Sequence, residues 1–168
     1  NIILTDAFQR QFSYLRLSIT DLCNFKCSYC LPNGYQGKAS QNELSLEEIK
    51  TLIASFAKLG FKKIRLTGGE PSLRKDLLEI IQICKSQPGI EKVCITTNGY
   101  RLDHFLPQWI KVGIDQVNIS IDSLSPEQFE LITSSSDLPM IIRALNHAID
   151  NGFTAIKINT VLLREYFD

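Results

Sequence analysis

The sequence predicts an α/β fold built on a parallel sheet, which is either open and doubly wound or curved into a partial barrel. Stretches of alternating or β-branched residues take turns with amphipathic stretches along all 168 residues, and no low-complexity linker interrupts them. Hydrophobic residues make up 44% of the chain, which is ordinary for a packed core. We therefore predict a single domain over residues 1–168 and exclude a disordered or collagen-like chain.

Five stretches are predicted as strands, and helical stretches with clear start and stop signals separate them. The strands are Tyr14–Thr20, Lys63–Thr67, Lys92–Thr97, Gln116–Asp122 and Ala155–Leu163. The helix signals are a capping box at Ser45 with a stop at Gly60, a start at Asp76 with a stop at Pro88, a stop at Gly113, and starts at Pro126 and Pro139. This order gives about five βα units.

Each predicted strand alternates between an apolar and a polar set of side chains. The apolar set is expected to pack under the helices, whereas the polar set carries three cations, Arg16, Arg65 and Lys157. Only Asp122 brings a carboxylate to that set, and burying an unpaired charge is costly. We therefore expect a partly closed barrel whose cavity holds a phosphate-bearing ligand. A sheet face exposed to solvent is the alternative.

Charge and hydropathy limit the partners of this chain. The 18 Lys and Arg residues balance the 18 Asp and Glu residues, which argues against binding to nucleic acid or to an anionic membrane surface. No stretch approaches the roughly 20 apolar residues of a membrane-spanning helix. The first ten residues also lack the basic and apolar pattern of a secretory signal, so we predict a cytoplasmic protein.

Three of the five cysteines, Cys23, Cys27 and Cys30, follow the first predicted strand, where βα proteins place their chemistry. Thiols this close together indicate a metal centre or reactive groups rather than disulfides. Structural zinc needs four ligands, and the only histidines, His104 and His147, lie in predicted helices. A [4Fe–4S] cluster suits three thiolates better, because it leaves one iron open for chemistry. The zinc alternative remains open.

Further motifs accompany the cysteines in a fixed order. They are Leu15–Asp21 leading into Cys23, then Arg65–Pro71, Thr96–Tyr100, Asn118–Asp122 and Lys157–Asn159. Together with Cys-x3-Cys-x2-Cys, these motifs resemble the radical S-adenosylmethionine (SAM) superfamily and, more closely, the GTP 3′,8-cyclase family. The resemblance runs almost end to end. It implies a partial (βα) barrel of the radical SAM type, here with about five units and truncated before the sixth.

The resemblance also implies a reaction. In this family the three cysteines would hold a [4Fe–4S] cluster whose open iron binds SAM, and an electron from a donor cleaves SAM to a 5′-deoxyadenosyl radical. That radical abstracts the ribose 3′ hydrogen of GTP, after which C3′ joins C8 of guanine. The implied protein is a lyase of the first step of molybdopterin cofactor biosynthesis.

Site residues carry over from the family position by position. SAM contacts fall on Tyr29, Gly69 and Ser120, and GTP contacts fall on Arg16, Arg65, Thr96 and Lys157. The second set includes the three cations of the polar strand face. Glycine at position 69 is physically sensible because it lets the backbone approach a ligand.

Two departures from the family pattern change what we expect. The family has a sixth βα unit and a C-terminal cysteine triad for a second cluster, whereas this chain ends after its fifth predicted strand and has no second triad. We expect a fragment that binds GTP weakly and is impaired in cyclisation. Its fifth strand would be a free sheet edge, which predicts an edge-strand dimer.

Two other functions stay open. The chain could be a non-catalytic module, either a nucleotide-binding remnant or a zinc-stabilised fold that uses Cys23, Cys27 and Cys30 structurally. It could also be a different radical SAM enzyme. The identity of the bound metal separates the first of these from a radical enzyme.

Overall fold

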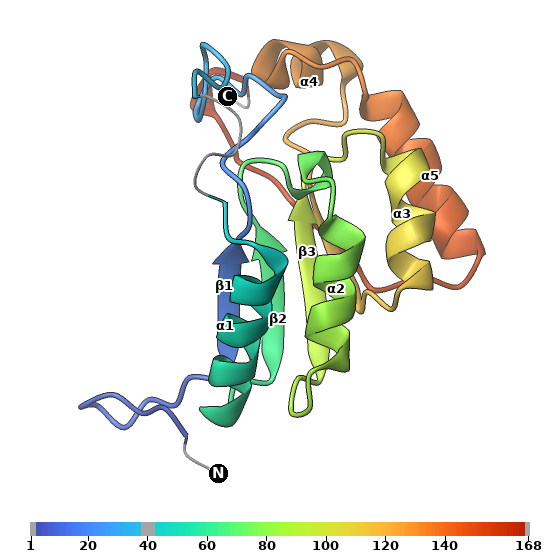
Figure 1. The fold of residues 1–168 in the computed structure, drawn as a ribbon. Helices are drawn as coiled ribbons and strands as arrows, with labels where there is room; N and C mark the ends of the chain where they lie inside the picture. The colour runs from blue at the N-terminus through green and yellow to red at the C-terminus, as the bar shows by residue number, and fades with distance from the viewer. Residues whose placement is uncertain (1–2, 38–42, 167–168) are drawn as a thin grey trace.

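Five parallel strands in sequential order form one sheet in the computed structural model, which describes residues 3–37 and 43–166 (Figure 1). The strands are β1 (Tyr14–Ser18), β2 (Lys63–Thr67), β3 (Lys92–Thr97), β4 (Gln116–Ser120) and β5 (Ile156–Asn159). Every neighbouring pair is parallel. Because each strand pairs with the next one in sequence, the order never reverses as it does in a doubly wound sheet. The barrel is not closed, since β1 and β5 lie at opposite edges.

Helices follow the strands as the capping signals predict. They are α1 (Leu46–Lys58), η1 (Pro71–Leu73), α2 (Leu77–Ser86), α3 (Leu102–Lys111), α4 (Pro126–Thr133), α5 (Leu138–Asp150) and η2 (Arg164–Tyr166). The predicted capping box is present at α1, where the Ser45 and Glu48 side chains each accept a hydrogen bond from the backbone of the other residue. Among the described residues, no helix is long and apolar enough to cross a membrane.

Three strands end earlier than the sequence predicts. β1 stops at Ser18 and β4 at Ser120, each two residues short, and β5 spans four residues only. The chain beyond β5 bonds to the end of β4 through side chains instead of a regular ladder. Thr160 Oγ1 donates to the Ile121 carbonyl at 2.7 Å, and the Val161 amide donates to Asp122 at 2.9 Å. These side-chain bonds replace the predicted continuation of the strand.

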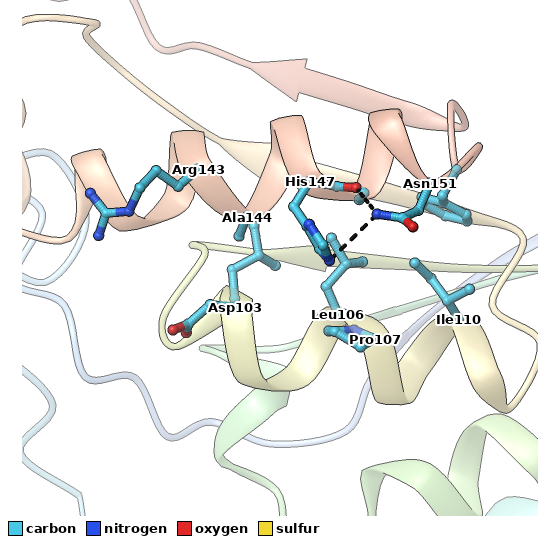
Figure 2. Close-up of a pocket in the computed structure, with 11 residues that line it drawn as sticks. Asp103, Leu106, Pro107, Ile110, Arg143, Ala144, His147 and Asn151 are labelled. Carbon is cyan, nitrogen blue, oxygen red and sulfur yellow. Dashed lines mark hydrogen bonds between the residues drawn. The ribbon is translucent and has the colours of Figure 1, made fainter.

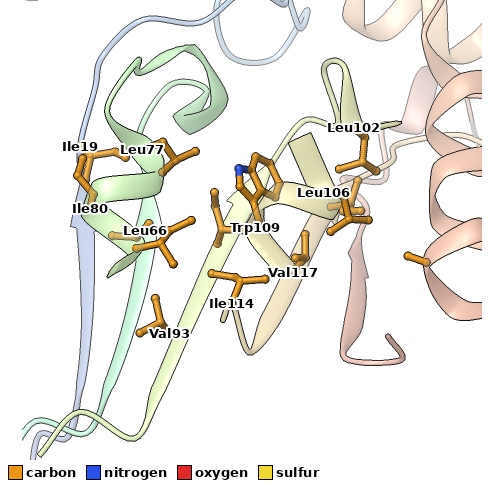
Figure 3. Packing of buried hydrophobic residues seen from close by; sticks show 14 of the residues in the cluster. Ile19, Leu66, Leu77, Ile80, Val93, Leu102, Leu106, Trp109, Ile114 and Val117 are labelled. Atoms are coloured by element: carbon orange, nitrogen blue, oxygen red, sulfur yellow. The ribbon is translucent and has the colours of Figure 1, made fainter. Parts of the chain in front are cut away.

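The apolar strand set packs under the helices, as predicted, in the three central strands. Ile64, Leu66, Ile95 and Ile119 are fully buried, and Trp109 of α3 packs among the same cluster (Figure 3). The prediction is wrong for β5, where Ile158 is 49% exposed. As an edge strand β5 has only β4 beside it, so its apolar residues lack the cover that the central strands have.

The polar strand set lies on the other face of the sheet. Helices α1, α2, α3 and α5 gather on one side of the sheet (Figure 1). Because side chains alternate along a strand, the polar set lies on the face opposite the apolar set that packs under these helices. Of the three cations, only Arg65 is buried, at 7% exposure, whereas Arg16 and Lys157 are exposed. The expectation of three buried charges is therefore wrong for the two on the edge strands, where solvent compensates the charge.

Candidate cofactor and substrate site

The cysteine loop, residues 22–31, begins just after β1 at the carboxyl ends of the strands. Backbone hydrogen bonds join the chain before it to the turn after β2: Gly69 N donates to the Thr20 carbonyl at 2.8 Å, and Glu70 N to the Leu22 carbonyl at 2.6 Å. Asn98, just beyond β3, donates to the Asn24 side chain at 3.2 Å. The loop is thus attached to the ends of two further strands.

The fourth βα unit holds the middle of the cysteine loop. The Lys26 amide donates to the Thr133 carbonyl at 3.0 Å, and the Ser28 amide donates to the Ile132 carbonyl at 2.8 Å. These are among the last carbonyls of α4, which have no partner within their own helix. Phe25 is 4% exposed and packs edge-on against Phe129 of α4, with ring centroids 6.3 Å apart. The cysteine loop therefore caps α4.

Tyr29, a predicted SAM contact, lies between the second and third cysteines of the loop. Its hydroxyl donates to Asp122 Oδ2 at 2.7 Å. Burial, followed by the neighbouring Asp122 carboxylate, raises the pKa of Tyr29 far above its usual range, so the hydroxyl remains a donor. Ser120, another predicted SAM contact, is the last residue of β4 and lies two residues before Asp122.

The three cysteines of the loop are free thiols. Burial and, to a smaller extent, the charges of Asp122, Cys23 and Cys30 raise the pKa of Cys27 to about 11. Burial likewise raises the pKa of Cys23, with smaller contributions from Glu70 and Cys30. The thiols are therefore near enough to oppose one another's ionisation. Three neighbouring thiolates need a bound cation to compensate them.

The donor set fits an iron–sulfur cluster in its chemistry, because three unpaired thiols share one short loop. In the described part of the chain, however, no three His, Cys, Asp or Glu side chains are gathered as ligands of a single metal ion. Mutual repulsion disfavours three neighbouring thiolates, and the positive charge of a bound cluster would compensate them.

Gly68 and Gly69 form a turn after β2 that has no room for a side chain. A Cβ at Gly69 would overlap the Leu22 carbonyl, and one at Gly68 would overlap the Thr20 carbonyl. The sequence predicts glycine here so that the backbone can approach a ligand. The structure adds a nearer cause, which is the close approach of the chain that leads into Cys23.

Glu70, which sequence reasoning did not select, is the most deeply buried acid of this edge. It is 0% exposed and accepts hydrogen bonds from Ser72 N at 3.0 Å, Thr97 Oγ1 at 2.7 Å and Asn98 N at 2.6 Å. Burial raises its pKa, although the three donors oppose that shift. Glu70 fixes the glycine turn to the end of β3. The only sequence signal for this role is its place directly after two glycines.

The predicted GTP contacts lie on the open face of the sheet. Register places Arg16 beside Arg65 and places Thr96, Asn118 and Lys157 in one row across β3, β4 and β5. Arg65 Nε donates to the Tyr14 hydroxyl at 2.5 Å, and Arg65 Nη1 donates to Thr96 Oγ1 at 3.4 Å. Tyr14 was not among the predicted site residues, although its alternation with Arg16 puts it on the same face.

A separate cavity of about 440 Å³ lies between α3 and α5 (Figure 2). Leu106 and Pro107 line it from α3, and Ala144 and His147 from α5. None of the predicted site residues lines this cavity, and it lies within the helical layer rather than at the strand ends. This cavity is therefore separate from the predicted cofactor and substrate site.

The model of the radical SAM superfamily matches residues 17–168. Together with the cysteine loop at the strand ends, this match shows that the chain belongs to the radical SAM superfamily, whose cofactors are a [4Fe–4S] cluster and SAM.

Among curated proteins, relatives of about 50% identity share one name. A GTP 3′,8-cyclase of Haemophilus ducreyi is 51% identical over 164 residues, which cover 97% of this chain and 48% of the relative. A GTP 3′,8-cyclase of Tolumonas auensis is 52% identical over 167 residues, which cover 99% of this chain and 50% of the relative. The chain thus spans about half the length of the curated relatives it matches.

Solved structures confirm the fold. SuiB of Streptococcus suis, bound to the precursor peptide SuiA, aligns with a TM-score of 0.73 at 16% identity over 88% of this chain and 32% of SuiB. HydG, a maturase of the [FeFe]-hydrogenase, aligns with a TM-score of 0.71 at 15% identity over 88% of this chain and 34% of HydG. The predicted partial barrel of the radical SAM type, with five βα units, is therefore confirmed.

Proposed function

We propose that this chain is the SAM-cleaving part of a GTP 3′,8-cyclase. The observation that carries the proposal is the placement of two groups on one sheet. The cysteine loop lies at the carboxyl ends of the strands, and Arg16, Arg65 and Lys157 lie on the open face of the same strands. Relatives about half identical to this chain bear that name, which supports the choice of GTP as substrate.

Cys23, Cys27 and Cys30 would hold the [4Fe–4S] cluster. When bound, the cluster supplies the electron for reductive cleavage of SAM. The protein would bind and orient SAM through Tyr29, through the turn at Gly69 and through Ser120 at the end of β4. Phe25, buried against α4, helps to keep water from the inner side of the loop.

Arg65 is the centre of the proposed substrate face. It is 7% exposed, and none of the ion pairs within the described residues includes it. Its hydrogen-bond partners, Tyr14 and Thr96, are neutral hydroxyls, so the guanidinium charge is uncompensated. Phosphate oxygens would compensate it, with Arg16 and Lys157 as further cations. The ribose and base would then lie toward the cysteine loop.

Further parts of the proposal concern the chain as a whole. The enzyme would be a lyase that receives its electron from a separate donor. The protein would lie in the cytoplasm, a reducing compartment in which five free cysteines are ordinary. We propose that residues 1–168 fold as one domain that cleaves SAM but cyclises GTP poorly. The free edge of β5 would pair with a second copy.

Anaerobic reconstitution with iron and sulfide, followed by EPR of the reduced protein with and without SAM, tests the proposed function. We expect a [4Fe–4S]⁺ signal that SAM changes, and no such signal in Cys27→Ala. Cys84→Ala is the matched control, because Cys84 is buried in α2 among apolar residues and lies away from the loop. One stoichiometric zinc in place of iron would refute the proposal and establish the zinc-stabilised module.

Sedimentation across a range of concentrations tests the β5 edge. We expect a monomer–dimer equilibrium that a proline at Ile158 weakens, since proline cannot donate to a strand ladder. A strictly monomeric chain at all concentrations would exclude the edge-strand dimer without affecting the proposed chemistry.

A further inference from the structure

A single buried carboxylate, Asp122, joins two segments that lie more than a hundred residues apart in the sequence. Its Oδ2 accepts the Tyr29 hydroxyl at 2.7 Å, and its Oδ1 accepts the Val161 amide at 2.9 Å. The residue is 3% exposed. Each oxygen therefore serves a different segment, and the carboxylate itself is buried although Tyr29 and Val161 are each 42% exposed.

The two segments belong to different halves of the proposed site. Tyr29 lies in the cysteine loop, one residue before Cys30. Val161 lies two residues beyond the end of β5, the strand that carries Lys157 on the proposed substrate face. The same segment is also attached to β4 through Thr160 Oγ1, which donates to the Ile121 carbonyl at 2.7 Å. Asp122 thus lies where the cofactor loop meets the end of the substrate face.

The third cysteine depends on this carboxylate more than the first two do. Leu22 and Asn24 are bonded to the turns after β2 and β3, and Lys26 and Ser28 are bonded to α4. From Tyr29 to Leu31, the backbone bonds among the described residues are local: the Cys30 and Leu31 amides both donate to the Cys27 carbonyl. The Tyr29 hydroxyl is the bond that ties this stretch to the sheet.

We propose that Asp122 is a positioning residue that fixes the Cys30 side of the cofactor loop relative to the end of β5. Hydrogen bonds to an ionised acceptor are stronger than neutral ones, and they weaken steeply when the geometry is lost. One carboxylate that holds both segments sets the separation between bound SAM and the face that carries Lys157. The substrate half of this inference rests on the proposed function, whereas the loop half rests on the geometry alone.

Hydrogen exchange of the protein before cluster insertion is the first arm of the test. Asp122→Ala should accelerate exchange about tenfold, the effect of losing one buried hydrogen bond, in both 24–31 and 160–163. Tyr29→Phe removes one hydroxyl and should accelerate exchange in 24–31 only. Asp115→Asn is the matched control, because this carboxylate accepts the Val93 amide at 2.6 Å at the opposite end of β4.

SAM binding to the reconstituted protein, followed by the SAM-dependent EPR change, is the second arm. We expect Tyr29→Phe and Asp122→Ala to require about tenfold more SAM for the same change. Asp122→Asn should recover most of the affinity, because an amide can still accept from Val161 and bond to the tyrosine hydroxyl. Asp115→Asn should bind SAM like the unaltered chain.

Two results would overturn the inference. One is unchanged exchange of 24–31 in Tyr29→Phe, and the other is altered exchange with unaltered SAM affinity, which would make Asp122 a purely structural residue. If Asp122→Ala fails to fold, Tyr29→Phe decides the matter. Failure of the unaltered chain to bind any cluster would instead overturn the proposed function. Hydrogen exchange would still decide whether the bond between Tyr29 and Asp122 holds the cysteine loop.

Discussion

Two arginines in this molecule are equally buried, at 7% exposure each, yet their surroundings differ. Arg74, just after η1, forms an ion pair with Asp76 at 2.7 Å and donates to the carbonyls of Ile19 at 2.7 Å and Leu44 at 2.5 Å. Arg65, on the open face of β2, has the hydroxyls of Tyr14 and Thr96 as its hydrogen-bond partners.

The difference separates a charge that is compensated within the protein from one that is not. Arg74 has a carboxylate and two carbonyls, so its charge is compensated within the protein and it joins the ends of three segments. Arg65 has neutral partners, so its charge is not compensated within the protein. Burial alone does not distinguish the two residues, whereas the charge of their partners does.

The largest expected effect is a loss of stability when Arg74, whose charge is compensated within the protein, is replaced. Arg74→Ala should lower the free energy of unfolding by about 3–5 kcal/mol, because it leaves Asp76 unpaired and two carbonyls without their donor. Urea denaturation followed by circular dichroism measures this change. Lys62→Ala, which breaks an ion pair whose side chains are 60% and 64% exposed, is the control and should change little. If Arg74→Ala lowered the free energy of unfolding no more than Lys62→Ala does, Arg74 would not be a structural residue.

Replacing Arg65, the proposed phosphate-binding arginine, should show the opposite pattern. Arg65→Met should leave stability nearly unchanged or raise it, because it replaces an uncompensated buried charge with an apolar chain of similar length. Binding of GTP should weaken about 10- to 100-fold, the equivalent of a lost charge-assisted hydrogen bond. Calorimetric titration with GTP measures the affinity, and inorganic tripolyphosphate tests the phosphate part. A stability loss comparable to that of Arg74→Ala would make Arg65 structural.

A smaller effect is expected at the hydroxyl that orients Arg65. Tyr14→Phe keeps the ring beside the guanidinium, with the Arg65 Cζ 5.8 Å from its centroid, and removes only the acceptor for Nε. GTP affinity should fall about fivefold, because the hydroxyl acts only by orienting the guanidinium. In the background of Arg65→Met the same substitution should have no effect on GTP affinity. Additive losses in the double variant would show that Tyr14 acts independently.

The smallest expected effect is a pH dependence of stability that comes from Asp76, the ion-pair partner of Arg74. Hydrogen bonds from Arg74 hold the pKa of Asp76 below its usual value of 3.8. A carboxyl with a lowered pKa stabilises the fold above its unfolded pKa, and that contribution is lost as pH falls through the folded pKa. Asp76→Asn should therefore be less stable than the unaltered chain at neutral pH, with a difference that shrinks below about pH 4. A constant difference down to acid pH would exclude this linkage.

Sequence patterns predicted the sheet, the helix starts and the side chains that share its polar face, because alternation and capping are local signals. Arg65 stood out because it alternates with Lys63 and Thr67 along one strand. Arg74 did not, since it follows a turn with no repeating pattern, and its partners Ile19 and Leu44 are distant in sequence. The same limit applies to Glu70 and to the docking of Phe25 on Phe129. Such contacts depend on which loops the sheet brings together.

The attachment of the cysteine loop to α4 affects the order of events during synthesis. The thiols lie between residues 23 and 30, but the helix that holds their loop ends at Thr133. Domains fold from the N-terminus during translation at about 5–20 residues per second, so roughly 5–20 seconds separate the cysteines from the helix they cap. Throughout that interval the three cysteines lack the helix to which their loop is bonded. The loop can therefore take its docked position only after the fourth βα unit has been made.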